Sequence, residues 1–97
     1  MSNKICDKVI RKEERHDAGY IYSYELTQRE GYTTVDYGVN LYSIKVKMTD
    51  SEGRTRKSEA KDVFSCKKRA LAFFDKIVRN LATPIDLKYI IEDEMTI

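Results

Sequence analysis

The residues that could support nucleophilic or metal chemistry are two cysteines and a single histidine. Cys6 and Cys66 lie far apart in the sequence and His16 stands alone, so their spacing matches no familiar metal site. Cys66 falls where a helix is expected to begin, and the dipole at a helix N-terminus can lower a thiol pKa. A redox-sensitive thiol is one interpretation, and a partly buried residue in the first helical turn is the preferred one. We expect no metal and no cofactor.

The carboxylates that could act as a general acid and a general base gather near the C-terminus. Glu92, Asp93 and Glu94 are adjacent in a predicted helix, so they point in different directions around its axis. Acid–base catalysis needs two groups that converge in one pocket. The four glycines are scattered, and no phosphate-binding loop or nucleophile motif is present. We therefore expect a protein that is not an enzyme, with an unrecognised loop site as a third and weaker alternative.

Basic side chains are concentrated in the middle of the chain. Residues 43–79 carry an excess of 6 positive charges and residues 80–97 an excess of 3 negative charges, within a net charge of +2. A basic surface beside exposed tyrosines could bind the phosphates of a single strand and stack with its bases. The alternative function is thus a nucleic-acid-binding accessory protein that uses the basic patch in residues 45–79. The small net charge and the absence of an RNA-binding signature make it the less favoured one.

Strands are the first elements that must position these residues. Residues 20–30 alternate strictly, with three tyrosines and Leu26 on one face. The polar run 8–17 is too hydrophilic for a central strand, and the run 55–64 is expected at a sheet edge. In the stretch between these two runs, the apolar residues change from odd to even positions, which predicts a β-bulge or break near residues 38–40. The three tyrosines are Tyr20, Tyr22 and Tyr24.

The last third of the chain changes to a period near 3.6 residues. Ser65 is the expected N-cap of a helix over residues 66–82, whose apolar residues form one stripe. Its first turn holds Lys67, Lys68 and Arg69, although the N-terminal end of a helix dipole favours anions. The cost is about a few tenths of a kcal/mol per charge. These three residues are therefore candidates for binding a partner.

A second helix is predicted after the only proline of the chain. Thr83 is the expected cap, Pro84 occupies the first helical position, and Asp86 stands where a capping box places its acceptor. Leu87 and Ile91 belong to an apolar stripe at helical spacing. Two interpretations of this helix stay open. The preferred one is a lid that packs on the sheet, and the other is a helix donated to the groove of a partner.

Three stretches of the sequence resemble a family of short bacterial proteins of unknown function. They are "DYGVNLYSIKV" at 36–46, "KDVFS" at 61–65 and "VRNLATPIDLKYIIEDEM" at 78–95, and the resemblance spans about residues 20–95. The sequence departs from the family pattern at Asp86, where that pattern favours histidine. The resemblance implies no activity, because the family has none assigned. The matching positions are Tyr37, Gly38, Asp62, Val63, Asn80, Pro84, Leu87, Glu92 and Asp93.

Together these patterns predict one α+β domain over residues 1–97, with the option that residues 1–7 are disordered. We expect an antiparallel meander of three to four strands, followed by two C-terminal helices packed on one face. No apolar run is long enough to cross a bilayer, and the first residues lack the apolar region of a secretion signal, so a cytoplasmic protein is expected. The expected function is a non-catalytic protein-interaction or regulatory module, which binds another protein or itself and no membrane. The candidate partner-binding residues are Lys67, Lys68, Arg69, Leu87 and Ile91.

Overall fold

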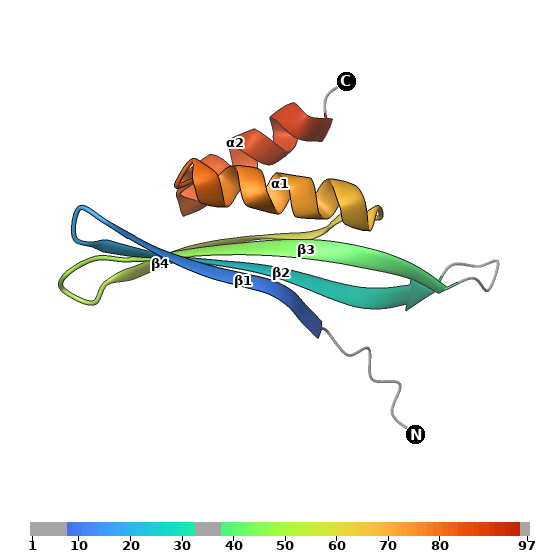
Figure 1. Ribbon diagram of the computed structural model, residues 1–97, viewed down its shortest axis with the longest axis horizontal. Helices are drawn as coiled ribbons and strands as arrows, with labels where there is room; N and C mark the ends of the chain where they lie inside the picture. Colours follow the sequence, from blue (N-terminus) through green and yellow to red (C-terminus); the bar gives the residue numbers. More distant parts are fainter. Residues whose placement is uncertain (1–7, 33–37, 96–97) are drawn as a thin grey trace.

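The chain folds into a four-stranded antiparallel sheet that two helices cover on one face (Figure 1). The computed structural model describes residues 8–32 and 38–95. The strands pair in sequence order, so the predicted α+β meander followed by two C-terminal helices is confirmed, with four strands. The predicted disorder of residues 1–7 lies outside the described residues. The elements are β1 (Lys8–Asp17), β2 (Tyr20–Tyr32), β3 (Gly38–Thr49), β4 (Thr55–Phe64), α1 (Lys67–Arg79) and α2 (Pro84–Met95).

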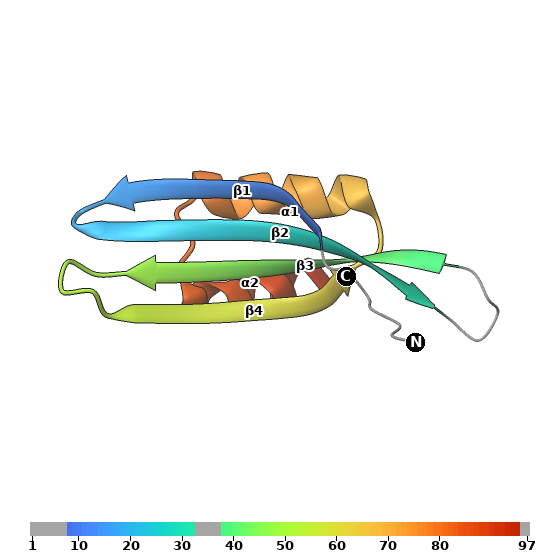
Figure 2. The same ribbon diagram turned by 90° about the horizontal axis from the view of Figure 1, so that it is seen from below.

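The core lies between the sheet and the helices, with α1 over β1 and β2 and α2 over β3 and β4 (Figure 2). Alternation along β2 turns Tyr22, Tyr24 and Leu26 toward the helices, where they are 8%, 0% and 0% exposed. Ile44 and Val46 of β3 are fully buried in the same layer. The tyrosine-bearing face is therefore a core face. The helices contribute Ala70, Phe73, Phe74, Ile77 and Leu87 to it.

The β-bulge or break predicted near residues 38–40 is wrong, because β3 continues without interruption from Gly38 to Thr49. β2 and β3 pair without a register shift along their whole shared ladder. The irregularities lie in the edge strands instead, between Val9 and Arg11 in β1 and in the part of β4 opposite Tyr42 and Ile44. The far ends of β2 and β3 extend beyond the helices (Figure 2), and no covering layer there requires apolar side chains to stay on one face. The switch of apolar residues from odd to even positions therefore needs no bulge.

Helix α1 begins and ends differently from the prediction. Its N-cap is Cys66, not Ser65, and the Cys66 side chain makes no capping hydrogen bond. The helix ends at Arg79 instead of residue 82, because Leu81 adopts a left-handed backbone with φ +52°. The Ala82 N–H then donates to the Ile77 carbonyl at 3.0 Å, which is the long hydrogen bond of a Schellman motif. A leucine in this conformation costs about 1 kcal/mol.

Helix α2 begins with the capping box that the sequence predicts. The Thr83 N–H donates to Asp86 Oδ2 at 3.1 Å, and the Asp86 N–H donates to Thr83 Oγ1 at 3.2 Å. Just before the cap, the Tyr24 hydroxyl donates to the Ala82 carbonyl at 2.8 Å in the buried layer. This bond ties the connection between the helices to the central strand β2. Because burial favours the neutral phenol, the pKa of Tyr24 is raised to about 12.

Candidate functional site

The structure separates the predicted partner-binding residues into two groups. Lys67 and Lys68 are exposed at the start of α1, and their contact with a partner stays a prediction. Leu87 is 1% exposed and packs in the core, while Ile91 is half-buried beside it. Leu87 therefore cannot reach a partner while α2 lies on the sheet. This packing matches the lid interpretation of α2. A binding surface on that helix must therefore use residues other than Leu87.

Each helix has charges that its dipole disfavours, basic at the start of α1 and acidic at the end of α2, and both sets lie at the same end of the molecule. α1 and α2 run in roughly opposite directions (Figure 1), so the basic start of α1 lies near the acidic end of α2. Arg69 Nη2 and Lys76 Nζ each lie 3.9 Å from a carboxylate oxygen of Glu94. The Arg69 guanidinium also lies 5.7 Å from the centre of the Phe64 ring. Intramolecular pairing thus gives Arg69 a role within the fold, although its side chain stays exposed like those of Lys67 and Lys68.

Cys66 lies at the same N-terminus and is exposed, so the expected partial burial of this residue is wrong. The backbone N–H groups of Arg69 and Lys68 favour the thiolate, so they lower the pKa of the Cys66 thiol below its ordinary value. This is the electrostatic setting that the redox-sensitive interpretation requires. The described residues contain no second cysteine, so the setting identifies no reaction.

The face of the sheet that the helices leave uncovered is mostly polar, although Val9 and Ile21 are exposed on it. One row across it alternates in charge, from Lys12 on β1 through Glu25 and Lys45 to Glu59 on β4. A depression of about 300 Å³ lies on this face. Tyr22, Tyr24 and Tyr42 point to the helix side, so the open face has no tyrosine platform from these residues for stacking bases. The depression is lined by Lys12, Ser23, Tyr24, Glu25, Lys45, Lys47 and Lys57.

An ion pair on this face holds an irregular part of β4. Asp62 has a left-handed backbone, with φ +53°. Arg29 Nε donates to Asp62 Oδ1 at 2.9 Å, and the Asp62 N–H donates to Ser43 Oγ at 2.8 Å. The hydrogen bond from Arg29 lowers the pKa of the Asp62 carboxyl. These contacts explain Asp62 as a structural residue, because they fix the strand next to the start of α1.

The outer face of α2 is the strongest candidate for a binding site. Ile85 and Tyr89 are 61% and 63% exposed, and they lie one helical turn apart on the side away from the sheet. Neither residue is among the predicted partner-binding residues, because the prediction rests on the apolar stripe of Leu87 and Ile91. A signal was present, because Ile85 and Tyr89 form a second apolar pair at i, i+4 spacing.

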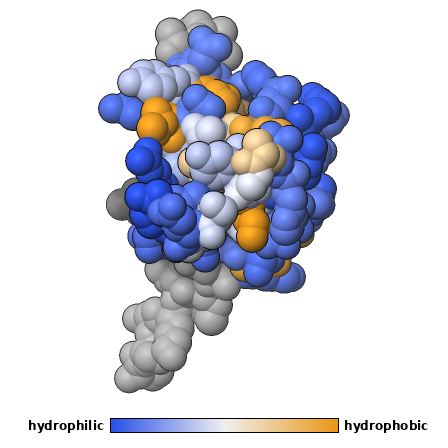
Figure 3. Space-filling model, turned by 90° about the vertical axis from the view of Figure 1, so that its left-hand side faces the viewer, coloured by the Kyte–Doolittle hydropathy of each residue, from blue (hydrophilic) through white to orange (hydrophobic). Residues whose placement is uncertain are grey.

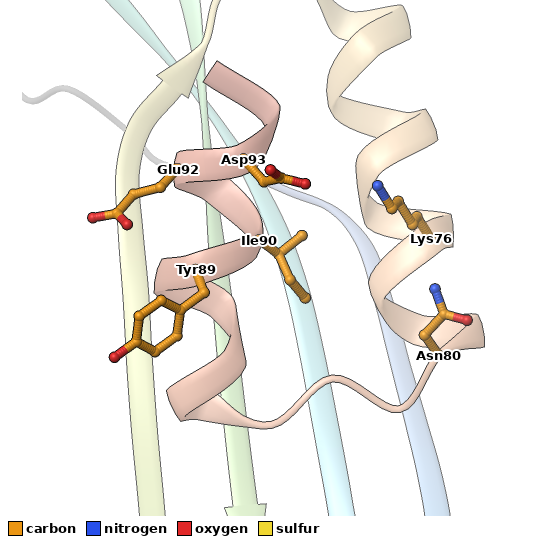
Figure 4. Close-up of a pocket in the computed structure, with 6 residues that line it drawn as sticks. All are labelled: Lys76, Asn80, Tyr89, Ile90, Glu92 and Asp93. Atoms are coloured by element: carbon orange, nitrogen blue, oxygen red, sulfur yellow. The ribbon is translucent and has the colours of Figure 1, made fainter. Parts of the chain in front are cut away.

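A shallow groove of about 650 Å³ runs between α2 and α1 next to this face. Figure 4 shows Ile90 and Asp93 on the side of α2 that faces α1, with Lys76 and Asn80 extending from α1. Tyr89 and Glu92 also line it, but they extend from the side of α2 that faces away from α1. The groove thus has an apolar wall on α2 and charged groups on both rims.

Further apolar surface lies where the hairpins turn and α2 begins. Figure 3 looks onto this end and shows orange and pale patches among hydrophilic surface. Tyr20 and Ile21, 39% and 36% exposed, begin β2 at this end. The apolar surface of Ile85 and Tyr89 is therefore not the only one, but its two residues are more exposed than these.

Two other kinds of site are absent from the part of the chain that the structure describes. Within residues 8–32 and 38–95, no group of three or more His, Cys, Asp or Glu side chains could hold a metal ion. Neither of the two described helices has the length and apolar character that crossing a membrane requires.

Comparison with known proteins gives the family and no activity. A model of a family of unknown function (DUF6514) matches residues 3–96, nearly the whole chain. No curated protein and no solved structure matches. The predicted resemblance to an uncharacterised family is thereby confirmed. The chain belongs to the DUF6514 family of unknown function.

Proposed function

We propose that this chain is a non-catalytic, cytoplasmic protein-interaction module, and that its partner docks on the outer face of α2. The observation that carries the proposal is the pair Ile85 and Tyr89, which are exposed although α2 already buries Leu87 against the sheet. A helix of a small two-layer protein needs one apolar face to fold. A second apolar face on the same helix is used when another molecule covers it.

The size of these side chains suits them to act as anchors. Burying an isoleucine or an aromatic side chain that was exposed contributes about 1.5–3 kcal/mol. Tyrosine is also among the residues that dominate binding energy at interfaces, because its ring is large and loses little conformational entropy. Ile85 and Tyr89 together could thus supply a substantial part of the free energy of a micromolar complex, about 8 kcal/mol.

The charge of this surface supports a partner segment with basic side chains. Glu92 and Asp93 lie on the groove next to Tyr89, and the last turn of α2 contains no basic residue. The negative end of the helix dipole adds to these carboxylates. The complementary partner is an amphipathic segment whose apolar side chains contact Ile85, Tyr89 and Ile90 and whose basic side chains approach the acidic end of α2.

The nucleic-acid alternative has weaker support. Lys67 and Lys68 are exposed, and four lysines surround the depression on the open sheet face. Glu25 lies in the same depression, however, and two of the three tyrosines considered for stacking, Tyr22 and Tyr24, are in the core. We expect no retention on single-stranded oligonucleotides at about 50 mM salt, where binding through phosphates would be strong. Steep, salt-dependent retention that Lys67→Ala with Lys68→Ala abolishes would favour this alternative instead.

The test compares two pairs of exposed apolar residues. The full-length chain carrying Ile85→Ala with Tyr89→Ala is compared with Val9→Ala with Ile21→Ala, a matched control on the open face of the sheet. Proteins captured from the native cell by the wild type are purified and titrated against each variant by calorimetry. We expect the α2 variant to bind the partner about 10-fold or more weakly and the control to bind as the wild type does. Equal binding by both variants would refute the α2 site.

A further inference from the structure

We propose that two copies of this chain associate through β4, which pairs with β4 of the second copy and forms a continuous eight-stranded sheet. β4 is an edge strand, since β3 is its only neighbour in the described sheet. An edge strand presents unpaired backbone groups to any strand that can align with it. This surface is centred on the backbone of β4 and not on Ile85 and Tyr89, so the inference goes beyond the proposed function, although Glu92 borders both surfaces.

The hairpin geometry shows which backbone groups of β4 point outward. The Asp50 N–H donates to the Arg54 carbonyl at 2.9 Å, which makes these residues a hydrogen-bonded pair at the closed end of the β3–β4 hairpin. Hydrogen-bonded pairs recur at every second residue of an antiparallel ladder. Ser58 therefore directs its N–H and C=O toward β3, whereas Lys57 and Glu59 direct theirs to the free edge. A second strand must pair with these two residues.

Charge selects one register for this pairing. If Lys57 lies opposite Glu59 of the second copy, the two-fold symmetry creates the same contact twice. Two neighbouring registers also direct the backbone groups of Lys57 and Glu59 at the second copy. One places Lys57 opposite Lys57 of the second copy, the other places Glu59 opposite Glu59 of the second copy, and both are repulsive. Within its own sheet Lys57 lies opposite Lys47, so a carboxylate from the second copy would also relieve that repulsion. In the selected register Ser58 lies on the two-fold axis.

The helix side of the edge provides a groove for the second copy. It has a volume of about 290 Å³ and an apolar floor of Ala60, Leu87 and Ile91. The selected register places Arg56 of the second copy opposite Ala60. Its aliphatic stem would cover this floor, and its guanidinium would approach Glu92, which extends from α2 on the side of β4 (Figure 4). Figure 2 shows α2 behind both β3 and β4, so the helix leaves the edge of β4 accessible.

The opposite edge of the sheet offers no equivalent. On β1 the side chains on the helix side already bind α1: Arg11 Nη2 donates to Asp75 Oδ1 at 3.2 Å, and Arg15 Nη1 donates to the Val78 carbonyl at 3.0 Å. Arg11 also lies over the Phe74 ring, with 5.4 Å to its centre. A second copy that paired with β1 would meet this occupied side instead of an apolar groove, so β4 is the edge that fits.

Sedimentation of charge variants tests the register. The wild type is expected to dimerise, and Lys57→Glu or Glu59→Lys alone to weaken dimerisation about 10-fold or more, because each puts like charges together twice. The double variant, with both substitutions, restores opposite charges and should recover the wild-type affinity within about 3-fold. Lys57→Glu places its carboxylate opposite Lys47, so it should fold normally. Glu14→Lys on β1 is the matched control and should dimerise as the wild type does.

A disulfide tests the position of the two-fold axis. Ser58→Cys, in a chain that also carries Cys6→Ser and Cys66→Ser, should form a disulfide-linked dimer under mild oxidation. In the selected register the two copies of residue 58 form a non-hydrogen-bonded pair, and the Cα atoms of such a pair are about 4.5 Å apart. Arg56→Cys in the same background is the control. It lies opposite Ala60 of the second copy, far from its own equivalent, and should remain mostly monomeric.

Three results would overturn the inference. One is a wild-type chain that sediments as a monomer at about 500 µM, and another is equal crosslinking of the Ser58→Cys and Arg56→Cys variants. The third is loss of dimerisation in Ile85→Ala with Tyr89→Ala while Lys57→Glu still dimerises. That result would make the second copy the occupant of the α2 face. Normal dimerisation by the α2 variant, with loss of its partner, would support both proposals separately.

Discussion

The two helices of this protein use their apolar residues differently. α1 buries Ala70, Phe73, Phe74 and Ile77 on one face, and none of residues 67–79 is an exposed large apolar side chain. α2 buries Leu87 but leaves Ile85 and Tyr89 largely exposed. Folding therefore accounts for the apolar residues of α1 and for only part of those of α2. The surplus apolar surface of α2, more than any catalytic-looking residue, is therefore the basis of the proposed partner site.

The N-termini of the two helices also differ, and here α2 has the more favourable contacts. α2 begins with a complete capping box between Thr83 and Asp86. α1 begins at Cys66 without a side-chain cap and has no acidic residue in its first turn. The helix with better packing thus has the poorer start, and the helix with surplus apolar surface has the better one. Local hydrogen bonds compensate α2 for its smaller share of the core.

The largest expected difference between the helices concerns two aromatic residues. Phe74→Ala should lower the free energy of unfolding by about 3–5 kcal/mol, because it leaves a cavity under α1. Tyr89→Ala, on the exposed face of α2, should change it by less than about 0.5 kcal/mol. Urea denaturation followed by circular dichroism measures both. A Tyr89→Ala variant destabilised as much as Phe74→Ala would mean that Tyr89 serves the fold and not a partner.

The next effect concerns the junction between the helices. Tyr24→Phe leaves the Ala82 carbonyl without its buried donor and should cost about 1–3 kcal/mol. The raised pKa adds a pH dependence: since the pKa of Tyr24 is about 12 in the folded chain and 10.0 ordinarily, its contribution to stability is complete below about pH 10 and is lost as the pH rises toward 12.

Denaturation between pH 9 and about 12 measures this dependence. The wild type should lose more stability over this interval than Tyr24→Phe does. Tyr89→Phe is the control, because its hydroxyl is on an exposed side chain, and it should follow the wild type. Identical alkaline behaviour of the wild type and Tyr24→Phe would contradict the role of the Tyr24–Ala82 bond.

The smallest effects test the helix starts. Thr83→Ala removes half of the capping box and should destabilise the protein by about 1 kcal/mol. Cys66→Ser adds a hydroxyl that can accept a hydrogen bond from the first turn of α1, so it should raise the midpoint of thermal unfolding. Scanning calorimetry measures both shifts. Shifts of the same sign would show that the two starts are more alike than their hydrogen bonds indicate.

Much of the fold follows from local patterns. Strict alternation over residues 20–30 places the tyrosines on the core face, and the order of hydrophilic and apolar runs predicts the outer strands. The predicted bulge is wrong because the alternation of apolar residues is constrained only where another layer covers the strand. The helices do not cover the far ends of β2 and β3, which pair without a register shift. The candidate site was predicted only in part, since the exposed apolar pair of α2 was hidden among residues of the same type.

By itself the sequence determined the α+β class, the strand order, the capping box at Thr83 and the family to which the chain belongs. These depend on neighbours within a few residues or on residue identity alone. Only the tertiary structure decided which apolar side of α2 faces the sheet, that Arg69 pairs with Glu94, and that an apolar groove lies beside the edge of β4. Such outcomes depend on how distant elements fit together, and side-chain shape and position in space set that fit.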